Sequence, residues 1–139
     1  MPASLPLRTD VPLADRWDVE AVFPSDAAFD EAFRAVERSI QALSRFQGSV
    51  GSSGAGLLDA LRERDRVAVE VDRLSLYASM QAATDATEQA NLARVDRTTG
   101  LSARYNAAVA YVEPELVALP DDDVSSLILS TPNLDAYRH

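Results

Sequence analysis

The sequence contains no cysteine, no lysine and a single histidine, which is the last residue, His139. Without cysteine the chain cannot form disulfides, thiolate zinc sites or cysteine nucleophiles. A histidine-based zinc site normally needs at least two or three imidazole ligands at set spacing, which one histidine cannot supply. These absences exclude cysteine nucleophiles and a zinc site built by this chain alone.

Positive charge is also scarce. The basic residues are 13 arginines against 22 acidic residues, so the net charge is -9. Such a chain would repel the phosphates of nucleic acids and anionic membranes. No run of about 20 apolar residues occurs, and the first ten residues lack the apolar stretch of a signal peptide. We therefore expect neither nucleic acid nor a membrane as a partner, and a cytoplasmic location.

No proline occurs between Pro24 and Pro114, and four of the five glycines lie between Gly48 and Gly56. In this window apolar residues recur every three or four positions, the period of one helix face. The pattern predicts an all-α fold, an antiparallel bundle of three long helices with a short C-terminal helix and an extended N-terminal arm. The predicted helices span residues 25–47, 57–83, 86–112 and 121–130, within a helical domain at 25–139 that follows an arm at 1–24.

The predicted helix at 57–83 is the centre of this arrangement. Its first half is amphipathic, whereas its second half is apolar over most of its circumference (Val67, Val69, Val71, Leu74, Leu76, Tyr77 and Met80). A helix with a wide apolar band must be covered on more than one side. We therefore expect the flanking segments to pack against it from both sides.

The arm carries the only tryptophan, Trp17, with Val22 and Phe23 shortly after it. Trp17 has two interpretations, a docking anchor for a partner or a plug that fastens the arm to the bundle. Large aromatic side chains dominate burial energetics, which favours the plug.

Other polar residues are better explained by structure than by chemistry. The glycine-rich loop lacks the Gly-Lys-Ser/Thr pattern of a phosphate-binding loop. Asp85 and Glu88 have the spacing of a reciprocal helix cap, and no nucleophile lies near them to support an acid/base pair. A glycine within the third helix, Gly100, indicates either a close helix contact or a small bend.

Five pieces of sequence, taken in order, resemble the N-terminal region of the oligoendopeptidase F family, which are thimet-oligopeptidase-like zinc metallopeptidases. The resemblance covers the chain from about Arg8 onward. The pieces are residues 16–25 (Arg-Trp-Asp-Val-Glu-Ala-Val-Phe-Pro-Ser), 46–48 (Phe-Gln-Gly), 74–80 (Leu-Ser-Leu-Tyr-Ala-Ser-Met) with Asp85, 114–116 (Pro-Glu-Leu) and 134–139 (Leu-Asp-Ala-Tyr-Arg-His).

The resemblance implies a helical wall of a deep channel that admits short peptides. The family holds zinc with a His-Glu-x-x-His helix and a further glutamate, all downstream of the region matched here. None of these positions exists in this chain, so the resemblance implies no site residue and no zinc in this chain, and no activity for the chain alone. Its partner would then be a missing catalytic lobe, and short peptides would bind only in the whole enzyme. The alternative is a standalone helical interaction module that pairs with itself or another protein and has no enzymatic activity.

Overall fold

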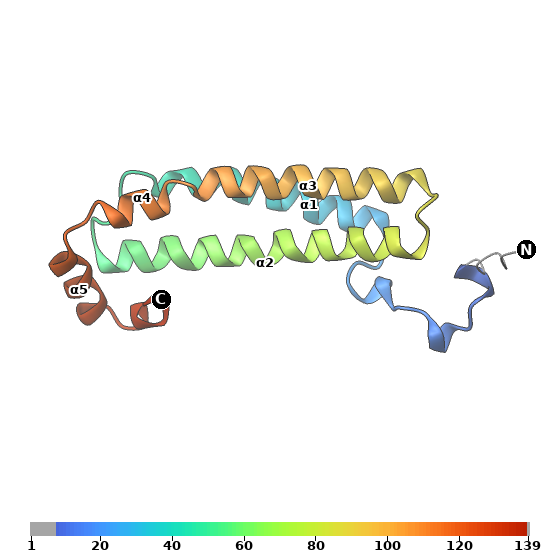
Figure 1. Cartoon of the computed structure of the whole chain (residues 1–139), viewed down its shortest axis with the longest axis horizontal. Coiled ribbons are helices and arrows are strands. Elements are labelled where there is room, and N and C mark those ends of the chain that lie inside the picture. Colours follow the sequence, from blue (N-terminus) through green and yellow to red (C-terminus); the bar gives the residue numbers. More distant parts are fainter. Residues whose placement is uncertain (1–7, 139) are drawn as a thin grey trace, which may run out of the picture.

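A computed structural model describes residues 8–138 of the chain, and all regular elements among them are helices (Figure 1). Three long helices lie side by side: α1 (Asp26–Ala42), α2 (Gly54–Thr84) and α3 (Gln89–Val109). Two shorter helices, α4 (Val112–Val117) and α5 (Asp121–Ser130), follow at one end of the bundle. The predicted all-α bundle is therefore confirmed.

Hydrogen bonds along α1 and α3 show that these two helices run parallel to each other. Arg97 donates to Asp30 at 2.8 Å and Arg104 donates to Glu37 at 2.8 Å, and both pairs are 67 residues apart. The separation is almost unchanged at the end of α3, where the Tyr111 hydroxyl donates to the carbonyl of Leu43, 68 residues away. Because α2 connects the ends of α1 and α3, it runs antiparallel to both.

The core consists of two apolar clusters, one toward each end of α2. The first joins the arm, α1, α2 and α3, and contains stacked and edge-to-face rings of Phe23, Phe29, Phe33 and Tyr77. The second surrounds the beginning of α2 and includes Leu57, Leu58, Leu61, Val112 and Leu134. Since both clusters use α2, the central role predicted for this helix agrees with the structure.

The connection between α2 and α3 differs from the predicted cap. Asp85 is the residue that ends α2, and its carboxylate accepts hydrogen bonds from the backbone and hydroxyl of Thr87. These hydrogen bonds lower the pKa of the Asp85 carboxyl. Glu88 caps α3 instead, by accepting from the backbone of Ala90. The prediction that Asp85 caps α3 is wrong because its side chain instead closes a local turn with Thr87, two residues later. The helix α3 therefore begins only at Gln89.

The ends of the helices depend on polar capping side chains and on close contacts, which the spacing of apolar residues does not reveal. Ser53 caps α2 by accepting from the backbone of Gly56, so the helix begins at Gly54. A Cβ on Gly54 would overlap the side chain of Thr131, so the chain after α5 approaches the start of α2 at a position that only glycine permits. A Cβ on Gly100 would meet nothing within 4 Å, so this glycine does not mark a close helix contact.

Candidate interaction surface

The second half of α2 has a buried side and an exposed apolar side. Val67, Val71 and Leu74 are at most 3% exposed and pack into the first core cluster. Val69 and Leu76 face the other way and are 64% and 56% exposed. Both flanking helices, α1 and α3, pack against α2 as expected, but together they leave part of the apolar band of this half exposed.

We define the α2 outer face as Val69, Leu76 and Met80, of which Met80 is partly buried. These residues lie on one side of the helix because their spacings of seven and four residues are close to whole turns. Two apolar residues more than half exposed on one helix side are unusual for the solvent face of a soluble helix, which is normally polar.

The arm reaches the end of this face and is held there by Val19 and Phe23. Asp18 accepts from the backbone of Ala21 and starts a short turn, Val19–Ala21. The turn directs Val19 and Phe23 into the core, where they are 1% and 4% exposed. Arg73 then stacks over the Phe23 ring at 4.5 Å and donates to the carbonyl of Val22.

Trp17 does not fasten the arm, because its side chain is 58% exposed. The predicted plug is therefore wrong, and the core positions of the arm belong to Val19 and Phe23. The reason is the turn that begins after Asp18, which places Val19 and Phe23 one helical turn apart on the inner side and leaves Trp17 before the turn. The carbonyl of Trp17 is still held, since it accepts from Arg8 at 3.0 Å.

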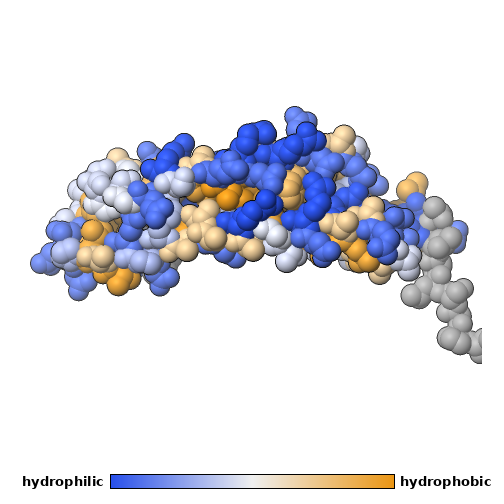
Figure 2. Space-filling model, turned by 90° about the horizontal axis from the view of Figure 1, so that it is seen from above, coloured by the Kyte–Doolittle hydropathy of each residue, from blue (hydrophilic) through white to orange (hydrophobic). Residues whose placement is uncertain are grey.

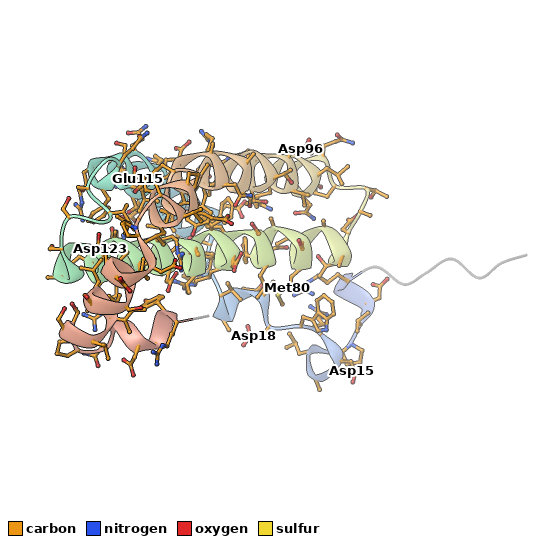
Figure 3. The ribbon with its side chains drawn as sticks, turned by 60° about the vertical axis from the view of Figure 1, so that its left-hand side comes forward. Asp15, Asp18, Met80, Asp96, Glu115 and Asp123 are labelled. Atoms are coloured by element: carbon orange, nitrogen blue, oxygen red, sulfur yellow. The ribbon has the colours of Figure 1, made fainter. Side chains whose placement is uncertain are left out.

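The exposed indole and the α2 outer face enclose a shallow depression of about 370 Å³, lined by Trp17, Asp18, Leu76 and Met80. Figure 3 shows Met80 on the side of α2 that faces the arm, with Asp18 and Asp15 on the arm below it. The acidic side chains of Asp18, Asp72 and Asp15 are all exposed around this region. Arg73 also lies on this side of the helix, four residues after Val69, and its side chain is half exposed. The depression is therefore apolar at its base and bordered by charges of both signs.

Near the beginning of α2, other residues of this chain cover the same side of the helix. Leu58 precedes Leu76 by about five helical turns and so lies on the same side of the helix. Leu58 is 7% exposed within the second core cluster, against which Leu127, Ile128 and Tyr137 pack. Figure 1 shows α5 and the C-terminal turn on the side of α2 away from α3. Tyr137 packs against this cluster, and burial and the nearby Asp65, one turn before Val69, raise the pKa of its hydroxyl.

The opposite side of the bundle has a different character. Figure 2 views this side and shows hydrophilic side chains over much of it, with smaller apolar areas between them. Arg97 and Arg104 pair there with acidic residues of α1. In the part of the chain that the structure describes, no helix is both long and apolar enough to cross a membrane.

No metal site accompanies the candidate surface. Among residues 8–138, no three His, Cys, Asp or Glu side chains lie close enough together to hold a metal ion. His139 falls outside the described residues. The acidic residues Asp85 and Glu88 bond to nearby backbone and hydroxyl groups, as described above, so the structure offers no pair of carboxylates arranged for acid/base chemistry at that turn.

No family model matches the chain, but individual proteins do. It is 33% identical over 135 residues to oligopeptidase PepF of Bacillus subtilis, a match that covers 97% of this chain and 20% of that protein. It is 26% identical over 124 residues to group B oligopeptidase PepB of Streptococcus agalactiae, covering 89% of the chain and 21% of the relative. The chain is homologous to part of oligoendopeptidase F. It spans about a fifth of the length of these relatives.

Solved structures agree with this oligoendopeptidase F homology. The crystal structure of oligoendopeptidase F from Enterococcus faecium matches with a TM-score of 0.73 at 25% identity, covering 83% of this chain and 23% of that one. A putative peptidase from Chlamydophila abortus matches with a TM-score of 0.75 at 19% identity, covering 97% and 23%, and shows the fold alone. The predicted resemblance is therefore confirmed for a partial region of this kind of protein.

The structure also explains why the oligoendopeptidase F-like pieces occur together. Phe23, from the first piece, contacts Tyr77, from the third, with ring centroids 5.3 Å apart. Glu115, from the fourth, accepts from the backbone of Gly48 at 2.6 Å and of Val50 at 3.3 Å, and so holds the loop that contains the second. Leu134, from the fifth, is 1% exposed in the second core cluster. Within the described residues, these contacts bring the pieces together in one fold.

Proposed function

We propose that this chain forms the N-terminal helical part of an oligoendopeptidase F-like zinc metallopeptidase, in which it makes one wall of the channel that admits short peptides. The observation that supports this most strongly is the 33% identity to oligopeptidase PepF over 97% of the chain. The described residues contain no group that fits a zinc ion, so the zinc and the reaction would belong to another part of the enzyme. The cytoplasmic location expected from the sequence stays a prediction, which cell fractionation checks.

The proposal is tested by a chimera in which this chain replaces the matched region of the Bacillus subtilis oligopeptidase PepF. We expect the chimera to cleave a short quenched peptide in the presence of zinc, and the same protein without the region to be inactive. The 139-residue chain alone should neither retain zinc after purification nor cleave the peptide. An inactive but folded chimera, or zinc-dependent cleavage by the chain alone, would contradict the proposal.

A second candidate function is a standalone module that pairs with itself or with another protein. The exposed α2 outer face favours it, because apolar patches of this kind usually mark interaction sites. Sedimentation of the purified chain distinguishes the two functions. A dimer that forms through Val69 and Leu76 would support the module, whereas a monomer with a functional chimera would support the peptidase part.

A further inference from the structure

We infer that the α2 outer face, together with Trp17, is the surface on which the larger part of an oligoendopeptidase F-like polypeptide docks. This inference rests on the proposed function and adds to it the side of the bundle that is buried in the whole enzyme. The docking partner is an apolar surface in the part of such a protein that lies outside the region matched by this chain.

The first argument is continuity with packing that the chain already makes. The same side of α2 is covered around Leu58 by residues of α5 and the C-terminal turn, and Asp65 lies near enough to Tyr137 to help raise the pKa of its hydroxyl. Val69 follows Asp65 by one helical turn and is exposed. The exposed stretch from Val69 to Leu76 is about 10 Å long, enough for one further helix to cross it. The outer face is thus a core surface whose second half lacks a covering element.

The second argument is the geometry of the two ends of this stretch. The arm stands at the far end, where Arg73 and the buried Phe23 hold it against α2. The carbonyl of Trp17 accepts a hydrogen bond from Arg8, which fixes the backbone at this residue. Its side chain nevertheless lies beside Leu76 and Met80, and the residue is 58% exposed. A fixed backbone with an exposed aromatic side chain loses little conformational entropy on binding, which is the usual character of an interface anchor.

The third argument is charge, which argues against a second copy of this chain as the occupant. Two copies of α2 packed antiparallel across Val69 and Leu76 would be related by a two-fold axis near Asp72. The axis places each Asp72 opposite its own copy, and like charges facing each other are destabilising. The same axis places each Arg73 opposite its own copy as well, and each chain has a net charge of -9. A different surface can place a basic residue opposite Asp72 and an acidic residue opposite Arg73 around an apolar centre, which a second copy cannot do.

The test uses two matched double variants. The first, Val69→Asp with Leu76→Asp, places charges in the α2 outer face. The control, Val117→Asp with Leu129→Asp, does the same at two exposed positions on α4 and α5 that are 78% and 81% exposed. In the 139-residue chain both variants should keep the melting temperature within a few degrees, because all four side chains are exposed.

In the chimera with Bacillus subtilis oligopeptidase PepF, the first variant should lower peptidase activity about ten-fold or more and make the chain accessible to limited proteolysis. The control should leave both activity and proteolysis unchanged, and the conservative variant Val69→Ile with Leu76→Met should retain activity.

Equal effects of the two charged variants, or no effect of the first charged variant in an active chimera, would overturn the inference while the proposed function stands. A chimera that is inactive without any substitution would overturn the proposed function and the inference with it. A stable dimer of the isolated chain that Val69→Asp dissociates would show that the occupant is a second copy.

Discussion

At the scale of the residue, burial decides the role of side chains that the sequence cannot tell apart. Val69 and Val71 are two positions apart on α2, but Val69 is 64% exposed and Val71 is 3% exposed. Val71→Asp buries an unpaired charge in the aromatic core and should destabilise the fold by about 3 kcal/mol or more. Val69→Asp should change the free energy of unfolding by less than about 0.5 kcal/mol. Urea unfolding followed by circular dichroism measures both, and equal losses would show that the two sides of α2 are wrongly assigned.

The tyrosines make stability depend on pH in the alkaline range. Burial raises the pKa of Tyr105 and Tyr111, whose hydroxyls donate to the carbonyls of Arg64 and Leu43. Because the folded pKa lies above the unfolded value of about 10, folding favours the protonated form, and its stability is fully present below that pH. We expect the melting temperature to fall as pH rises through the folded pKa, and to fall less in Tyr105→Phe. A melting temperature independent of pH between about 8 and 11 would contradict this.

The arm shows what a sequence cannot tell at this scale. Burial of Phe23 follows from its ring contacts with Phe29 and Tyr77, which lie on different helices. Trp17 is the larger aromatic residue and on residue type alone the better candidate for burial. The turn capped by Asp18 decides between them, and its direction depends on contacts with α2 such as that of Arg73 with Val22. The sequence therefore predicted that the arm is anchored, but not by which residue.

At the scale of the element, the helices could be predicted and their ends only in part. The period of apolar residues reports which face is buried, and it identified three long helices. It does not report where a helix stops, since that depends on individual side-chain hydrogen bonds. Asp85 bonds to Thr87 and leaves the cap of α3 to Glu88. The outer face of α2 could not be predicted either, because an apolar band does not reveal which side the same chain covers.

Gly54 and Gly100 both lie in helices but have different surroundings, so replacing each with alanine tests the packing around the two helices. Gly100 lies within α3, and an added Cβ would meet open space. Gly100→Ala should therefore stabilise the protein by about 1 kcal/mol, since alanine is the better helix former. Gly54→Ala should destabilise it, because the added Cβ would overlap Thr131. Thermal unfolding of both variants measures the difference, and a loss of stability in Gly100→Ala would indicate that the helix surface there is already occupied.

At the scale of the whole molecule, α2 connects two core clusters that have different origins. The first is made by the arm and the three long helices, and the second needs Leu134 from the C-terminal turn. The pairs between α1 and α3 hold the register along the bundle but are largely exposed, and exposed ion pairs contribute at most about 1 kcal/mol each. The fold therefore depends mainly on these two clusters, and the first is the one behind the exposed stretch of α2.

This arrangement predicts that the C-terminal turn can be loosened without unfolding the rest. Leu134 is 1% exposed, and Leu134→Ala should cost about 2 to 5 kcal/mol through the cavity it leaves. The loss should first open α5 and the start of α2, because only the second cluster contains Leu134. Amide hydrogen exchange should therefore show reduced protection near Leu58, with protection near Leu74 retained until global unfolding. Leu129→Ala is the matched control, since Leu129 is 81% exposed and should change neither region. Equal loss of protection at both ends would show that the two clusters unfold as one unit.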